Sequence, residues 1–434
     1  MSIYKKILCT LIFTFATNLL MAQSNGENGS SPNSNSPYSR YGFGLLSDQS
    51  FGNSRAMGGI AIGLRDGYQI NPANPASYTA IDSLTFLLDA GISFQNGNFS
   101  DGLTKLNAKN TSFDYIAMQF RLHKRVGMTL GFLPFSSVGY NISTTQKITG
   151  TGISNLNSYN VFSGEGGINQ LFVGLGVKAL NNLSIGMNAS FLFGSITQTT
   201  QTGFSESSIN TTQKERKVTV RDYKLDFGIQ YTQPLAKKHS ITLGAVYSLG
   251  HKMNTEAYTA IQRISTGSGS TIIEGYEKTP IKKGFDFPHS FSAGITYNYN
   301  KSVTAGFDYT RQQWGKAAYF GETGILQNRD KYAVGAEYIP NPFTRSYFKR
   351  IRYRIGAYYS TPYVSINGAD AKEFGASAGF GLPIFQNKSL LNISVQYSKV
   401  KPNIQKKGLL EENYIRLNIG LTFNERWFAK WRVE

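Results

Sequence analysis

The chain has 434 residues and a formal net charge of +18 at pH 7, and it is 40 % hydrophobic and 13 % aromatic. Its one cysteine, Cys9, lies in an N-terminal export signal, so the mature chain cannot contain disulfides, thiolate metal sites or cysteine nucleophiles. Beyond that signal no apolar run approaches the roughly 20 residues of a transmembrane helix. If the mature chain lies in a membrane, it must cross it as strands.

Residues 1–22 have the pattern of a secretory signal peptide, with Lys5 and Lys6, an apolar stretch over 7–20, and Ala22 before a polar run. A lipoprotein signal would need a small residue before Cys9, where this chain has leucine. We therefore expect cleavage after about Ala22. An exported basic protein is expected to meet anionic lipid head groups rather than nucleic acid.

Residues 23–37 are rich in Ser, Asn and Gly and predict a disordered leader. Residues 38–83 show no sustained period and contain a doubled Asn-Pro-Ala element. Proline fixes its φ and removes a donor, and asparagine side chains bond to nearby backbone, so the element predicts a compact irregular turn. We expect 38–83 to form a hatch, or plug, for the region that follows, with the element inside it or at its periplasmic mouth: Asn71, Pro72, Ala73, Asn74, Pro75 and Ala76.

After residue 83 one alternating segment follows another. Between 391 and 397, for example, leucine, isoleucine, valine and tyrosine alternate with asparagine, serine and glutamine. Small and polar residues opposite an apolar face suit a barrel whose outside meets lipid. The predicted strands are 84–96, 112–122, 125–145, 168–180, 183–200, 217–233, 240–255, 287–299, 301–313, 330–340, 350–360, 373–384, 389–400 and 412–424.

With these strands, short and long links alternate strictly, as bacterial barrels require. The short links, such as 123–124 and 181–182, all fall at one end, and long stretches such as 146–167, 201–216 and 256–286 fall at the other. The predicted fold is therefore all-β: a transmembrane antiparallel barrel of about 14 strands over 84–424 with an N-terminal plug. Both termini lie on the periplasmic, short-turn side, and 425–434 form a periplasmic tail.

Several charged residues fall on strand positions whose alternation points their side chains into the lumen. A charge that faced lipid would cost about 2–4 kcal/mol at mid-membrane. We expect ion pairs and hydrogen bonds between these residues and the plug, or alternatively a polar pathway for anionic ligands. They are Asp89, Asp226, Asp308, Glu337, Arg352, Arg354 and Arg416.

The third predicted strand contains Pro134, followed by Ser136, Ser137 and Gly139. A closed barrel has no free edge where a proline could sit, so the wall must bulge or kink there. Elsewhere, the four histidines are scattered and no serine has a nucleophile motif. We expect no catalytic residue, no metal or other cofactor, and no enzyme activity.

The double Asn-Pro-Ala element, Gly164 to Ile168 leading into Leu183 to Met187, and Phe287-Pro288 resemble the FadL family of hydrophobic-substrate transporters. With Tyr38 to Gly42 and Asn424 to Phe428 at its ends, the mature chain resembles the FadL-like outer membrane proteins of Bacteroidota. The resemblance implies a fourteen-stranded barrel, a hatch, and passive uptake of hydrophobic molecules. It also implies a lateral opening into the membrane at the third strand, involving Phe132, Pro134, Ser136 and Gly139.

Two functions compete. The first is passive uptake of hydrophobic or amphipathic molecules through a plugged lumen in a Gram-negative outer membrane. The second is a non-transporting barrel that serves as a subunit of a larger complex for protein export or outer-membrane biogenesis, which the polar external loops favour. A general polar porin is disfavoured because the N-terminal residues need the lumen. Expected partners are outer-membrane lipid or lipopolysaccharide, a hydrophobic ligand or detergent in the lumen, and other envelope proteins.

Overall fold

The computed structural model describes residues 36–83, 85–102, 104–148, 156–206, 209–267, 270–281, 284–365, 370–384, 389–403 and 410–426. The expected signal peptide, the leader before Ser36 and the tail from residue 427 onward lie outside these ranges. Within them, no helix has the length and apolar character needed to cross a membrane.

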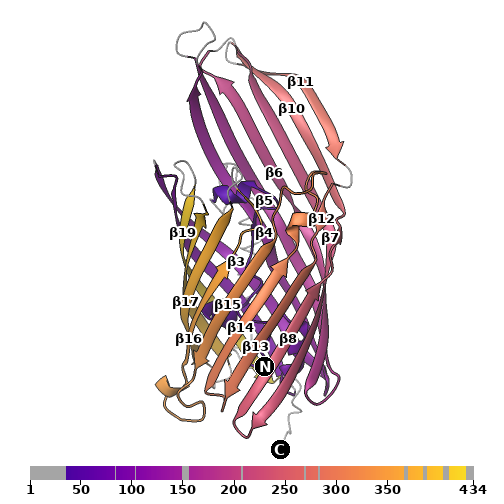
Figure 1. Ribbon diagram of the computed structural model, residues 1–434, viewed down its shortest axis with the longest axis vertical. Helices are drawn as coiled ribbons and strands as arrows, with labels where there is room; N and C mark the ends of the chain where they lie inside the picture. Colours follow the sequence, from indigo (N-terminus) through magenta and orange to yellow (C-terminus); the bar gives the residue numbers. More distant parts are fainter. Residues whose placement is uncertain are drawn as a thin grey trace, which may run out of the picture.

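Fourteen antiparallel strands form one closed barrel (Figure 1). Each strand pairs with the next in the chain, β8 pairs with β13, and β19 pairs with β2 to close the sheet. The predicted barrel fold is thereby confirmed. Its strands are β2 Thr85–Ser100, β3 Lys105–His123, β4 Val126–Lys147, β5 Asn157–Lys178, β6 Leu183–Phe204, β7 Thr211–Ala236, β8 His239–Ser248, β13 Ser290–Tyr299, β14 Val303–Gln312, β15 Arg329–Tyr338, β16 Arg352–Ser360, β17 Ala371–Ile384, β18 Ser389–Pro402 and β19 Glu411–Arg426.

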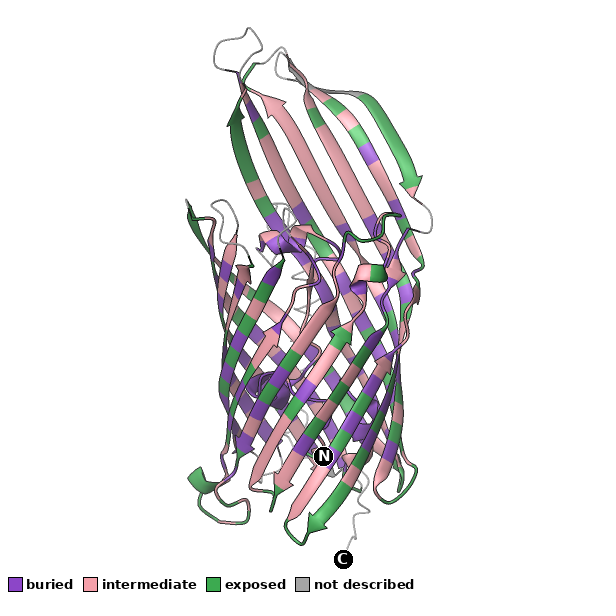
Figure 2. Cartoon of the chain, in the orientation of Figure 1, coloured by how far each residue is buried: buried purple, intermediate pink, exposed green. Residues whose placement is uncertain are grey.

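Burial alternates from one residue to the next along the strands (Figure 2), as expected when successive side chains face the outside and the lumen. On β18, Val395 and Tyr397 are 49 % and 46 % exposed, whereas Asn392 and Ser394 are buried. An outer face of exposed apolar and aromatic side chains is a lipid-facing surface. The inner face is therefore the polar one, and it determines what can occupy the lumen.

The short links lie at one end, as predicted. One of them joins β13 to β14, where Asn300 and Lys301 have φ of 50° and 58° and the N–H of Ser302 bonds to the carbonyl of Tyr299 at 2.8 Å. Positive φ at both central residues is the twist that a hairpin turn prefers.

A sheet rises above one side of the barrel at the other end (Figure 1). Here β4 to β7 continue past the rim, β10 (Thr255–Gly267) pairs with the first part of β7, and β11 (Ser270–Ile281) pairs with β10. The prediction of long links at 146–167, 201–216 and 256–286 was therefore wrong, because much of these stretches is strand. Small and polar residues such as glycine, serine, threonine, asparagine and glutamine are frequent in them, and the hydrophobic alternation that marks a membrane strand is missing. A smaller sheet pairs β9 (His251–Lys252) with β12 (Asp286–Phe287).

Residues 36–83, called here the lumenal segment, run down the inside of the barrel. They contain η1 (Pro37–Arg40), β1 (Leu45–Leu46), α2 (Gly52–Ala56) and η2 (Pro75–Ala80). Ser36 donates to Glu412 at the external end of β19 (Oγ to Oε1, 2.7 Å), while the carbonyl of Ile81 accepts from Arg121 at the periplasmic end of β3 (3.2 Å). Although the barrel starts and ends on the short-turn side as expected, the first described residue lies at the external end.

Candidate functional site

The Asn-Pro-Ala element lies low in the lumen against β5, β6 and β7. Its asparagine side chains bind the backbone of the lumenal segment, and Asn188 of β6 donates to the carbonyl of Pro72 at 2.9 Å. Pro75 and Ala76 open η2, and Ala73 borders a cavity. Further bonds run from Asn71 Nδ2 to the carbonyl of Ala61 (2.6 Å), from Asn74 Nδ2 to the carbonyl of Ile62 (2.8 Å), and from the N–H of Ala76 to Asn74 Oδ1 (3.1 Å).

Glycines of the wall allow the backbone of the lumenal segment to lie directly on the strands. A Cβ on Gly356 would come within 2.1 Å of the carbonyl carbon of Met57, and one on Gly186 within 2.4 Å of that of Pro75. Only glycine permits so close an approach. Wall glycines that meet the backbone of the segment in this way are Gly127, Gly176, Gly186, Gly244, Gly335 and Gly356.

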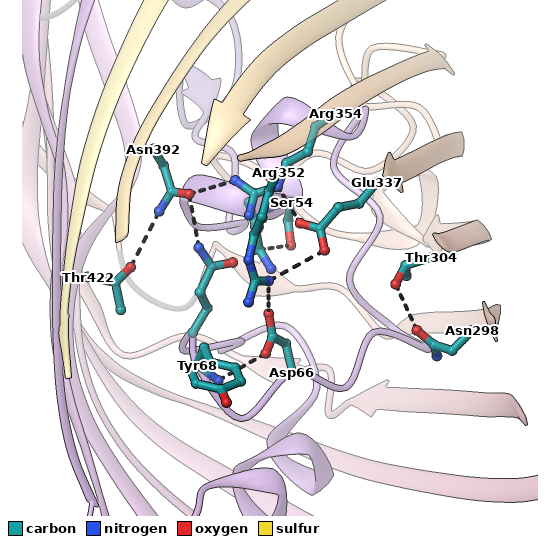
Figure 3. A network of polar contacts seen from close by, with 12 residues as sticks. Ser54, Asp66, Tyr68, Asn298, Thr304, Glu337, Arg352, Arg354, Asn392 and Thr422 are labelled. Atoms are coloured by element: carbon teal, nitrogen blue, oxygen red, sulfur yellow. Dashed lines mark hydrogen bonds and ion pairs between the residues drawn. The ribbon is translucent and has the colours of Figure 1, made fainter. Parts of the chain in front are cut away.

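Three of the predicted lumen charges form one network, which reaches the segment through Arg352 (Figure 3). Arg352 of β16 lies 2.8 Å from Asp66 of the segment and 3.4 Å from Glu337 of β15. Arg354 lies 2.7 Å from Glu337 and donates to Asn392 of β18 at 2.6 Å. Because buried charges are costly unless they are paired, these contacts hold the two parts in one arrangement.

A fourth predicted charge, Asp308 of β14, accepts the N–H groups of Ala61 and Ile62 at 2.5 and 2.8 Å. Two others bond within the wall: Asp226 pairs with Lys224 and accepts from Ser248, and Arg416 donates to Gln95 at 3.1 Å. Asp89, buried on β2, bonds both to Thr422 and Tyr115 of the wall and to the backbone of Ile70 in the segment.

The wall is interrupted between β3 and β4. Their ladder ends at the pair Ile116 and Phe132, while β3 continues upward on β2 and β4 continues on β5 through a bulge between Pro134 and Ser136. Phe132, Pro134, Ser136 and Gly139 thus lie where β4 starts to lack a wall neighbour on the β3 side. Whether lipid or ligand passes there stays a prediction.

The lumenal segment occupies this free edge of β4. β1 pairs with it, with Leu45 opposite Ser137 and Leu46 opposite Ser136. Below and above β1, three more bonds continue the contact: from the N–H of Ser47 to the carbonyl of Phe135 (2.9 Å), from Gln49 Nε2 to the carbonyl of Pro134 (3.3 Å), and from Ser39 Oγ to the carbonyl of Gly139 (3.2 Å). The segment that runs through the lumen therefore also lies along the edge of β4 that β3 leaves unpaired.

A cavity of about 320 Å³ remains beside the segment. Sites for hydrophobic ligands are lined mainly by apolar side chains with a few polar groups. The lining of this cavity is mixed. Apolar side chains such as Leu133, Phe135 and Phe172 lie beside five acidic and four basic residues: Asp48, Asp226, Asp308, Glu373, Glu412, Lys224, Arg329, Lys331 and Arg416. A hydrocarbon in this cavity would therefore lie against charged groups as well as apolar ones.

Aromatic side chains cover the external end of the lumen. Phe43 of the segment packs edge-on against Tyr319 and beside Trp314, with ring centroids 5.2 and 5.8 Å apart. Phe285 joins the same cluster, and Tyr363 donates to the carbonyl of Gly44 at 2.5 Å. The external links between β11 and β12, β14 and β15, and β16 and β17 therefore pack onto the segment.

The carboxylate of Asp48, in the lumenal segment, contributes to the stability of the fold by an amount that depends on pH. Burial alone would raise the pKa of this carboxyl, but Lys331 and Arg55 and the hydrogen bonds from Ser50 outweigh burial and lower the pKa to about 2. A carboxyl whose pKa is lowered on folding stabilises the fold above its unfolded pKa of about 4, and that stability is lost as the pH falls through about 2.

We therefore expect Asp48→Asn to lower the free energy of unfolding at neutral pH by about 2 kcal/mol or less. The difference from the unsubstituted chain should vanish between about pH 4 and pH 2. Urea unfolding in lipid vesicles across this range measures it. A difference that persists unchanged at the acid end would show that the charge of Asp48 is not its cause.

Other pairing residues escaped the sequence argument. Arg55 of α2 lies 2.6 Å from Asp114 of β3, and Asp66 lies 2.8 Å from Arg352. Of these four residues, the sequence singled out only Arg352. In a segment without a helix or strand period, the sequence does not indicate in which direction a charged side chain points. No group of three or more His, Cys, Asp or Glu side chains that could hold a metal occurs within the described ranges.

The closed fourteen-stranded barrel is the fold of FadL-like outer membrane channels. Solved structures with this fold include the CymD monoaromatic hydrocarbon channel (TM-score 0.60, 14 % identity, 89 % of this chain and 100 % of that one) and the Ralstonia pickettii toluene transporter TbuX (0.56, 13 %, 86 % and 98 %). A Pseudomonas aeruginosa FadL homologue gives 0.53 at 13 % identity, covering 88 % of this chain and 98 % of that one. At such identities the likeness concerns the fold.

The family of the chain is shown by its sequence. The model of the BamG family matches residues 3–434, and the chain belongs to that family.

Proposed function

We propose that the protein is an outer-membrane barrel that does not conduct through its lumen and serves as a subunit of a larger envelope complex, in protein export or outer-membrane biogenesis. One observation carries this proposal: the lumenal segment is bonded to the wall at β14 and β16 and pairs with the edge of β4 that β3 leaves free. We infer from these contacts that it closes the barrel. The proposal includes export by the N-terminal signal peptide, with cleavage after about Ala22, to the outer membrane of a Gram-negative bacterium.

The contacts of the segment argue for a permanent seal. A hatch that moves would have to leave the ion pairs of Asp66 and Arg55, the two N–H bonds to Asp308 and the ladder of β1 on β4. A ligand shifts such an equilibrium only by the difference in its affinity for the two states. A hydrocarbon in this cavity would lie beside nine charged residues, which lose contact with water without gaining a polar partner, and this argues against a hydrocarbon as the ligand that opens the barrel.

Passive uptake of hydrophobic molecules is the second candidate. The end of the β3–β4 ladder at Phe132 favours it, because that is where a lateral exit would have to lie. The fold is also shared with proteins described as a hydrocarbon channel and a toluene transporter. Membership of the BamG family, together with the charged cavity, supports the scaffold function over this one.

Purification from its own membrane in a mild detergent tests the choice. We expect a C-terminally tagged chain to elute in a complex of fixed stoichiometry through size-exclusion chromatography. An unrelated barrel, tagged and expressed at the same level, controls for detergent and tag. An isolated barrel with a hydrophobic molecule retained in the lumen would instead support uptake.

A further inference from the structure

The longest of the described periplasmic links joins β15 to β16 and spans residues 339–351. It contains three basic residues, Arg345, Lys349 and Arg350, and no acidic one. Two of its aromatic side chains are among the most exposed in the described part of the chain, Phe343 at 78 % and Phe348 at 74 %. Large apolar side chains in this position indicate a contact with something other than water.

The link has a defined conformation. The N–H of Asn341 bonds to the carbonyl of Lys349 at 2.8 Å, and η4 (Phe348–Arg350) closes the turn. Arg350 lies over the ring of Tyr347, with its guanidinium carbon 6.0 Å from the ring centroid. The basic and aromatic side chains are therefore presented by an ordered turn.

The link is continuous with the lipid-facing wall. Tyr353 of β16 points outward, next to the 65 % exposed Ile355, and donates to the carbonyl of Phe348 at 3.3 Å. In Figure 2 the link stands out sideways from the base of the barrel and is exposed over most of its length. This position places it in the plane of the periplasmic head groups rather than beneath the barrel.

We propose that this link is a membrane foot, which binds the phosphate groups of anionic phospholipids in the periplasmic leaflet. Phe343 and Phe348 occupy the interface as aromatic side chains do at membrane boundaries, and Arg345 and Lys349 meet the phosphates. The outward direction and the bond to Tyr353 favour lipid over a periplasmic protein as the occupant. The inference is independent of whether the barrel transports.

The test uses Phe348→Trp in the mature chain, reconstituted in phosphatidylcholine nanodiscs that contain a minor share of phosphatidylglycerol. Bromine on the acyl chains of one lipid or the other quenches nearby indole fluorescence. The chain without Phe348→Trp supplies the background of the three native tryptophans. We expect stronger quenching by brominated phosphatidylglycerol than its share of the bilayer predicts.

Adding Arg345→Gln and Lys349→Gln should lower this enrichment by roughly 5-fold for each charge removed. Lys237→Gln with Lys238→Gln is the matched control, because that periplasmic turn is exposed and basic but lacks large aromatic side chains; it should leave the enrichment unchanged. Equal quenching by both lipids would overturn binding of anionic head groups. Absence of quenching by either would overturn the membrane foot and indicate a soluble partner.

Discussion

Deletion of residues 38–80 should convert a silent barrel into an open pore. In planar bilayers we expect the intact chain to give background current and the shortened chain to give stepwise openings. The strands that remain have a polar inner face, which water can fill once the segment is gone. Removing β1 also uncovers the edge of β4, but in a flooded lumen its backbone groups can bond to water.

A deletion of 255–281 is the matched control, because it removes β10 and β11 from the external sheet and leaves the lumen filled. It should show the same background current as the intact chain. Heat-dependent migration on a denaturing gel verifies that each barrel has folded. If the chain without 38–80 folds and remains silent, the lumenal segment is not what closes this barrel.

The strand pattern made the barrel predictable because its physical cause is local. A residue on β18 either faces lipid or the lumen, and the two environments select opposite side chains at successive positions. The expected strand at 389–400 therefore lies inside the observed Ser389–Pro402. The same reasoning failed above the rim, where water lies on both sides of residues 201–204 and 211–216, and nothing selects an alternation there.

The sequence could predict the charged residues of the wall but not their partners in the lumenal segment. Strand parity directed Asp308, Glu337, Arg352 and Arg354 into the lumen, but it could not name their partners, which lie far away in the sequence. Asp66 and the N–H groups of Ala61 and Ile62 belong to a segment without a period. Pro134 likewise indicated a bulge in the third predicted strand, which the structure has between Pro134 and Ser136. The pairing of β1 with this part of β4 could not be predicted, because it depends on the path of the lumenal segment.

Glu337→Gln should cause the largest loss of stability among single substitutions in the lumen. Glu337 accepts from both Arg352 and Arg354, so its neutralisation leaves Arg354 without a carboxylate in a buried position. Breaking a buried pair by removing one partner costs about 3–5 kcal/mol. Urea unfolding in lipid vesicles, followed by tryptophan fluorescence, measures the loss. Glu411→Gln, which removes the more exposed pair with Lys399, should cost about 1 kcal/mol or less.

A double substitution separates the lost pair from the loss of a side chain in general. Glu337→Leu with Arg354→Leu removes both charges, while Arg352 keeps Asp66 at 2.8 Å. Because replacing a whole buried pair by apolar residues is often neutral, this variant should recover most of the stability that Glu337→Gln loses. A double variant as unstable as the single one would mean that the packing of these side chains, and not an orphaned charge, holds the segment to β15 and β16.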